Sequence, residues 1–136
     1  MTMQETYERI IALMILQGNP ATVLDLSAGI VCRYNTKDGD QCAVGCLLPA
    51  GLLPEGTSSR VTALPRWVLR RLGADGADDG YGMLTLLARL QRAHDSYVTS
   101  KHWLRYFLAS AVSIGEYAKL DTSFAVEAHR ESELYS

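Results

Sequence analysis

The sequence predicts an α+β fold, in which a two-stranded antiparallel hairpin packs against about four helices. Four segments place apolar residues at the three-to-four-residue spacing of an amphipathic helix. Residues 30–47 instead hold two short β-prone runs on either side of Asp38-Gly39, a dipeptide typical of tight hairpin turns. Because an isolated hairpin is only marginally stable, we expect the helices to cover it or another strand to extend it.

The composition is that of one globular domain. The 136 residues are 48% hydrophobic and 21% charged, which is close to the globular average. A chain of this length buries enough surface to fold without a disulfide or a metal ion. We place the domain at residues 1–130 and expect the polar residues 131–136 to form a frayed C-terminal tail.

Charge and hydropathy exclude several classes of protein. The net charge of −2 argues against a protein that coats nucleic acid. No apolar run reaches the roughly 18 residues that suggest a membrane span. The first ten residues carry Glu5 and Glu8 where a signal peptide needs positive charge. The sequence therefore predicts a cytoplasmic protein without a membrane partner.

The first helix is expected over residues 3–17, where Gly18 and Pro20 end it. The hairpin follows, with strands over residues 30–34 and 41–47 and a three-residue loop at Lys37-Asp38-Gly39. That loop sets the register of three facing pairs: Thr36 with Asp40, Tyr34 with Cys42, and Cys32 with Val44.

Three more helices are expected, over residues 64–72, 81–93 and 100–118, with a short last turn over 124–128 capped by Asp121. The segment before the third helix is rich in glycine and aspartate. Its aspartates lack the alternating spacing and the final glutamate of a calcium-binding loop. We therefore expect them to cap the third helix.

The three cysteines, Cys32, Cys42 and Cys46, suggest a zinc site with His94 or His102 as the fourth ligand. On a straight strand, however, Cys42 and Cys46 lie about 13 Å apart, whereas two sulfurs on one zinc ion lie within about 4 Å. Their apolar neighbours would raise a thiol pKa, which disfavours a reactive cysteine. We therefore predict no metal and no cofactor, with the cysteines as small packing residues. If zinc binds after all, the three cysteines and His94 are its ligands.

His94 falls on the apolar side of its helix, next to Asp95 and near Trp103 in the sequence. We interpret it as a buried structural histidine that holds the junction between the third and fourth helices. The sequence contains no nucleophile elbow, phosphate loop or zinc-protease motif, so no catalytic residue is assigned.

The candidate binding residues are five arginines on the second and third helices: Arg66, Arg70, Arg71, Arg89 and Arg92. Residues 60–105 carry eight basic and four acidic side chains, a balance of +4 between acidic flanks. Such a surface, with Tyr81, Tyr97 and Trp103 nearby, suits a nucleotide or an acidic partner. The alternative interpretation is that these arginines are ordinary solvated positions on helix faces.

The run from Cys32 to Leu47, with the pattern C-x-Y-x3-D-G-x2-CAVGCL, is followed by L-x-R-L-Q-R-A-H-D ending at Asp95 and then by Trp103. These segments resemble a group of small bacteriophage and prophage proteins that share such a hairpin and a later L-Q-x-x-H-D…W segment. The resemblance covers residues 32–103. It implies a phage origin and no particular mechanism, and Ala50-Gly51 depart from the acidic residues expected there.

The function expected from these observations is a non-enzymatic, phage-derived protein that binds and occludes a host protein in the host cytoplasm, such as a component of a defence system. A homo-oligomer is possible, and a nucleic-acid partner is not expected. One alternative is a domain that binds or processes a nucleotide-like small molecule through the arginines. The other is a zinc-stabilised module.

Overall fold

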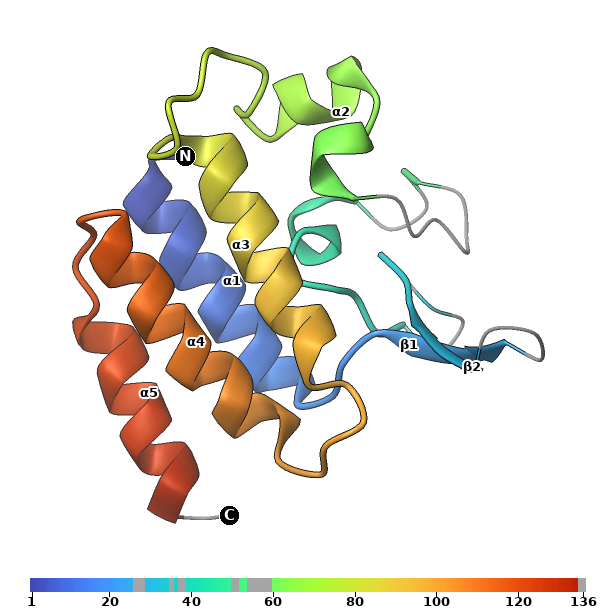
Figure 1. The fold of residues 1–136 in the computed structure, drawn as a ribbon, viewed down its shortest axis with the longest axis vertical. Coiled ribbons are helices and arrows are strands. Elements are labelled where there is room, and N and C mark those ends of the chain that lie inside the picture. Colours follow the sequence, from blue (N-terminus) through green and yellow to red (C-terminus); the bar gives the residue numbers. More distant parts are fainter. Residues whose placement is uncertain (26–28, 35, 37–38, 50–51, 54–59, 135–136) are drawn as a thin grey trace.

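Five α-helices make up most of the chain that the computed structural model describes, which is residues 1–25, 29–34, 36, 39–49, 52–53 and 60–134 (Figure 1). The helices are α1 (Met3–Gln17), α2 (Arg66–Arg71), α3 (Met83–Ser96), α4 (Trp103–Tyr117) and α5 (Ser123–Leu134). Two 3-10 turns, η1 (Gly45–Leu47) and η2 (Val61–Ala63), lie in the connection between α1 and α2. None of the helices in these ranges is both long and apolar enough to cross a membrane.

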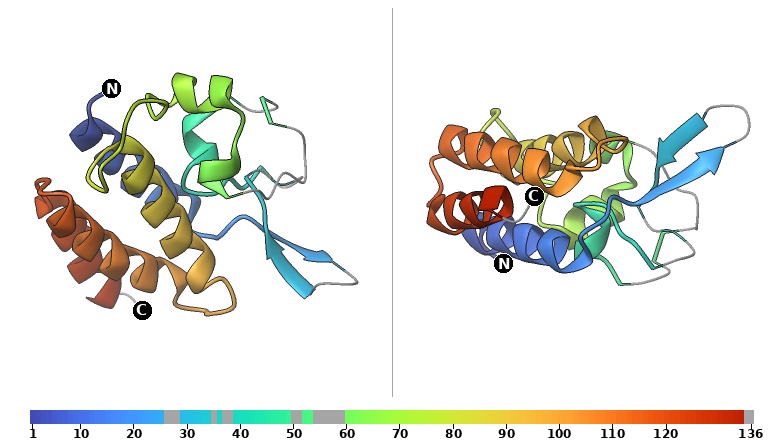
Figure 2. Two further views of the ribbon diagram at one scale, coloured as in Figure 1. Left: turned by 45° about the horizontal axis from the view of Figure 1, so that its top comes forward. Right: turned by 90° about the horizontal axis from the view of Figure 1, so that it is seen from below.

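The α+β prediction is wrong, because helices packed on one another organise the fold and no covered hairpin forms over residues 30–47. The expected return strand is absent: its residues 45–47 form η1. The strand expected to pair with it is β2 (Gly29–Cys32), which pairs antiparallel with β1 (Thr22–Asp25) on its N-terminal side. This short ribbon projects from the helices (Figures 1 and 2).

The turn before η1 follows the predicted register only in part. The Thr36 N–H donates to the Asp40 carbonyl at 2.9 Å, and the Cys42 N–H donates to the Tyr34 carbonyl at 3.2 Å. Asp38 lies outside the described residues. Beyond Cys42 the chain coils, and the Cys46 N–H donates to the Cys42 carbonyl at 3.0 Å. The third predicted pair, Cys32 with Val44, is therefore wrong, because Cys32 pairs with Thr22.

Gly45 explains why the chain coils at this point. A β-carbon built on Gly45 would overlap the carbonyl oxygen of Tyr34, so only glycine allows the two backbone segments to approach this closely. By local propensity alone, Val44-Gly45 is poor helix material. Tertiary contact overrides that propensity, since Cys42, Ala43 and Val44 are all completely buried in the turn.

Helix α1 lies at the centre of the bundle and contacts α3, α4 and α5. The stripe that the sequence predicts consists of Tyr7, Ile10, Ile11, Met14 and Ile15. The first four are fully buried, whereas Ile15 is 37% exposed. The Tyr7 hydroxyl donates to the Ala111 carbonyl of α4 at 2.7 Å. At the two ends, a capping box formed by Thr2 and Glu5 starts the helix, and the left-handed Gly18 stops it.

Asp78 caps α3, as the aspartate-rich segment predicted. Its Oδ1 accepts hydrogen bonds from the Gly80 and Gly82 N–H groups and from the Thr85 hydroxyl, while Oδ2 accepts the Thr85 N–H at 2.9 Å. Partial burial opposes ionisation, but the hydrogen bonds outweigh it and lower the pKa of Asp78 to about 2. The carboxylate therefore fixes the position at which α3 begins.

The C-terminal helix is longer than the predicted turn over residues 124–128. Asp121 does cap it, since its Oδ1 accepts the Ser123 N–H at 2.9 Å. Helix α5 then packs along α4 with Ala125 fully buried and continues to Leu134. The segment expected to fray thus forms the last turn of α5 up to Leu134, and residues 135 and 136 lie outside the described residues.

Candidate functional site

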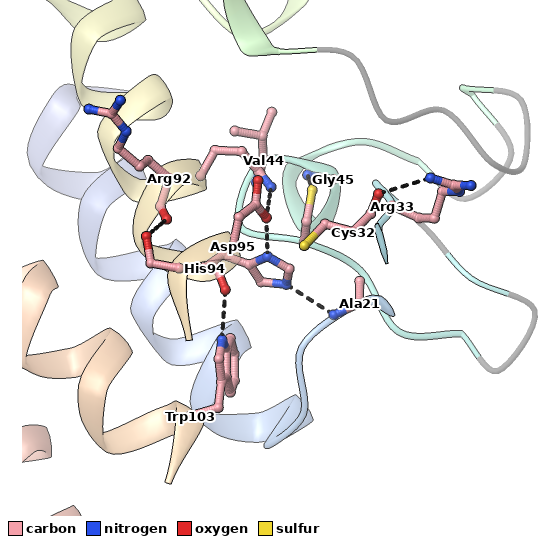
Figure 3. Close-up of polar contacts among 12 residues, drawn as sticks. Ala21, Cys32, Arg33, Val44, Gly45, Arg92, His94, Asp95 and Trp103 are labelled. Atoms are coloured by element: carbon pink, nitrogen blue, oxygen red, sulfur yellow. Dashed lines mark hydrogen bonds and ion pairs between the residues drawn. The ribbon is translucent and has the colours of Figure 1, made fainter. Parts of the chain in front are cut away.

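A buried polar network joins the C-terminal end of α3 to the chain around Ala21 and Cys32 (Figure 3). His94 is completely buried at its centre, as predicted. The Ala21 N–H donates to His94 Nε2 at 3.0 Å, so Nε2 must be the unprotonated nitrogen of a neutral ring. The proton then lies on Nδ1 and is donated to Asp95 Oδ1 at 2.7 Å.

Asp95 is the shared acceptor of this network, which we call the His94–Asp95 network and which also contains Ala21, Cys32 and Gln91. The Gln91 side-chain amide donates to Asp95 Oδ1 at 3.0 Å, and its carbonyl oxygen accepts the Val44 N–H at 3.1 Å. Burial, the Asp95 charge and a hydrogen bond to that carboxylate together raise the pKa of Cys32 to about 12. The thiol is therefore protonated and donates to Asp95.

Trp103 completes the junction between α3 and α4, as predicted. Its indole N–H donates to the His94 carbonyl at 2.8 Å. The Trp103 and His94 rings meet edge-on with centroids 5.4 Å apart. Figure 3 shows Trp103 and Ala21 reaching the same histidine from two different elements. The network therefore connects three parts of the chain that are distant in sequence.

Three side chains of the network, Cys32, His94 and Asp95, place potential metal ligands within 4.8 Å of one another. A neutral histidine that binds metal through Nδ1 carries its proton on Nε2. That proton would point at the Ala21 N–H, so two donors would face each other and the hydrogen bond would be lost. Both ring nitrogens are thus already used, and the thiol is held protonated. The geometry fits a structural network better than a metal site.

The other two cysteines of the conditional zinc set lie in the η1 turn. Cys42 Sγ accepts the Gly45 N–H at 3.2 Å, and the Cys46 thiol donates to the Ala43 carbonyl at 3.0 Å. Neither belongs to the group formed by Cys32, His94 and Asp95. Burial raises the pKa of both thiols, to about 12 for Cys46, which disfavours nucleophilic chemistry at either sulfur.

The five candidate arginines separate into two sets. Arg66, Arg70 and Arg71 are exposed on α2, where Arg70 forms an ion pair with Asp75 at 3.4 Å. Arg89 and Arg92 lie one turn apart on α3 and line two neighbouring grooves, one between α3 and η2 and the other between α3 and α4. The described lining of these grooves includes no arginine from α2.

Two pairs of tyrosines flank the groove between α3 and α4. Tyr81 stacks on Tyr117 with ring centroids 5.2 Å apart, and the Arg89 guanidinium lies 3.9 Å from the centroid of the Tyr117 ring. At the other end of the groove, the centroids of Tyr97 and Tyr106 are 5.1 Å apart. All four tyrosines are exposed, although each is held by a ring partner.

The groove between these pairs has a volume of about 360 Å³ and a floor of small side chains, among them Ala93, Ser110 and Ser113. Tyr106 and Tyr117 are eleven residues apart, which is about three helical turns and about 16 Å along α4. We call this surface the α3–α4 face and define it by eight residues: Tyr81, Arg89, Arg92, Tyr97, Tyr106, Ser110, Ser113 and Tyr117.

The binding residues predicted from the sequence include part of this face. Arg89 and Arg92 were predicted as binding residues, with Tyr81, Tyr97 and Trp103 near them in the sequence. Trp103 does not belong to the face, since it is 3% exposed and packs against Phe107. Tyr106 and Tyr117 were missed, although their eleven-residue spacing on an amphipathic helix predicts a shared face.

Comparisons with known proteins assign no family to the chain. It matches no protein-family model, no curated protein and no solved structure. The candidate site therefore rests on the contacts of the residues described above.

Proposed function

We propose that this chain is a small, non-enzymatic binding protein that uses the α3–α4 face to occlude an acidic surface of a host protein. The observation that carries the proposal is the stack of Tyr81, Tyr117 and Arg89 beside the groove. Tyrosine and arginine are the side chains most enriched among the residues that dominate binding energy at protein interfaces.

The face is organised before it binds. Each exposed tyrosine is restrained by a partner ring, so little side-chain entropy remains to be lost on association. Arg89 and Arg92 have no carboxylate within ion-pair distance among the described residues. Their positive charge is therefore available to steer and hold an acidic partner.

A phage origin is part of the proposal. The segments that resemble phage and prophage proteins supply the residues that meet around His94, including Cys32, Gln91, Asp95 and Trp103. Such a set would be retained because it holds the fold together. The resemblance thus concerns the scaffold that supports α3 and α4, and the expected place of action is the cytoplasm of the host cell.

The test is capture of a host protein, followed by binding measurements with the purified partner. We expect the double variant R89E/R92E to weaken binding by roughly 100-fold, because two interface arginines at about 1.4 kcal/mol each give that factor. We expect Y117A, which removes the ring beneath Arg89, to weaken binding by roughly tenfold. Arg92 and Tyr117 are exposed and Arg89 is half-buried, so the melting temperatures of both variants should stay near that of the wild type.

The matched control is R66E/R71E, which makes the same charge change on α2. It should bind the partner as the wild type does. Loss of binding in R66E/R71E but not in R89E/R92E would move the contact surface to α2 and refute the assignment to the α3–α4 face.

A further inference from the structure

A second groove lies between α3 and η2, next to the α3–α4 groove, with which it shares Arg89, Arg92 and Ser96. Its volume is about 470 Å³, within the range of sites that hold small molecules. Arg60 reaches it from the start of η2, and Arg89 and Arg92 reach it from α3. Arg60 is not one of the five candidate binding arginines predicted from the sequence, because it precedes the second helix and shares no helical face with them.

The three arginines of this groove lack counter-ions within the described part of the chain. The ion pairs found there involve Arg70, His94, His129 and Arg130, and none involves Arg60, Arg89 or Arg92. Three guanidinium groups around one concave surface raise the local positive potential. Guanidinium groups also match the planar, two-oxygen geometry of a phosphate. The groove is therefore suited to a phosphate group.

The groove also has an acceptor, since Asp95 lines it. This carboxylate is 40% exposed, and its Oδ1 is fixed by His94 and Gln91. The Cys32 thiol also donates to this carboxylate, and the two oxygens together still have acceptor capacity for a donor such as a ligand hydroxyl or amine. Inorganic phosphate alone would fill only part of the groove and would not need this acceptor.

We infer that this groove binds a phosphorylated small molecule of about the size of a nucleoside monophosphate. The arginines hold the phosphate, and Asp95 accepts a hydrogen bond from a hydroxyl of the ligand. The site shares Arg89 and Arg92 with the α3–α4 face but is otherwise built from different residues. Arg60 and Asp95 line this groove and do not belong to the α3–α4 face, whereas Tyr106 and Tyr117 belong only to that face.

Calorimetric titration of the intact protein tests the inference with four probes: adenosine monophosphate, ribose 5-phosphate, inorganic phosphate and adenosine. We expect the two phosphorylated sugars to bind more tightly than inorganic phosphate, and adenosine to bind weakest. R60A should weaken the phosphorylated probes by roughly tenfold, as expected for the loss of one charge-assisted contact. R66A removes the same charge from α2 and should have no effect.

Two outcomes would overturn the inference. One is the absence of binding of every phosphorylated probe to protein with a native melting temperature. The other is equal weakening by R60A and R66A, which would indicate attraction by overall charge. Because Y117A leaves this groove intact, it should bind the probes normally even though it is expected to lose the host protein. Failure of this inference is thus distinguishable from failure of the proposed function.

Discussion

Replacing His94 with alanine tests whether the His94–Asp95 network holds the fold together. The substitution removes the acceptor of the buried Ala21 N–H, the donor to Asp95 and the ring that meets Trp103. It also leaves a ring-sized space at a position with no solvent exposure. The expected result is a large loss of stability with no change in the identity of the fold.

The magnitude follows from these contacts. Leaving a buried N–H without an acceptor costs about 1–3 kcal/mol, and losing the hydrogen bond to Asp95 costs about 1 kcal/mol more. The edge-on contact with Trp103 contributes about 0.5–1.5 kcal/mol. We therefore expect H94A to lower the free energy of unfolding by about 4 kcal/mol. For a domain of this size that is a fall in melting temperature of roughly 10–15 °C.

Urea titration followed by circular dichroism measures this loss. H102A is the matched control, because His102 is only partly buried and lies at the start of α4. This variant should lower the free energy of unfolding by less than about 1 kcal/mol. H94Q can still offer an oxygen to the Ala21 N–H and should lose about half as much as H94A. A loss below about 1 kcal/mol for H94A, or equal losses for H94A and H102A, would refute the role given to the network.

Three further predictions concern the cap of α3, the turn at η1 and the thiols. The pKa of Asp78 is about 2 in the folded protein and about 3.9 in an unfolded chain, so its stabilisation is complete above about pH 5 and is lost as the pH falls toward 2. D78N should lower the free energy of unfolding by about 1 kcal/mol at pH 7, as is typical for the loss of a helix cap. It should also show a smaller further loss of stability between pH 5 and pH 2 than the wild type, and parallel pH profiles of the two proteins would contradict this. G45A should lower the free energy of unfolding by at least about 2 kcal/mol, because the added β-carbon would overlap the Tyr34 carbonyl. G76A is the control: a β-carbon there has no atom within 4 Å, so thermal unfolding should be nearly unchanged. Since burial raises the pKa of Cys32 and Cys46 to about 12, both thiols should react with iodoacetamide far more slowly at pH 8 in the native protein than in denaturant; rapid native labelling of Cys32 would indicate an activated thiol.

The helices were predictable because their signals are local. The apolar stripe of α1 and the stops at Gly18 and Pro20 lie within a few residues of one another, as do Asp78 and the first turn of α3. His94 was also recognisable as a buried residue, because the periodicity of α3 places it on the same side as Leu90. The sequence alone therefore predicted α1 to α4 and most of the buried faces of α1 and α3, but it predicted α5 only as a short turn.

Only the tertiary structure decided how residues 21–47 are arranged. The turn signal near Gly39 was read correctly, but strand pairing depends on the partner that the fold places alongside, and β2 pairs with β1. The coil at η1 depends on the approach of Gly45 to Tyr34, which no local propensity records. The convergence of Ala21, Cys32 and Asp95 on His94, and of Arg60 with Arg89 and Arg92, joins residues far apart in sequence. Such contacts depend on the packing of whole elements against one another.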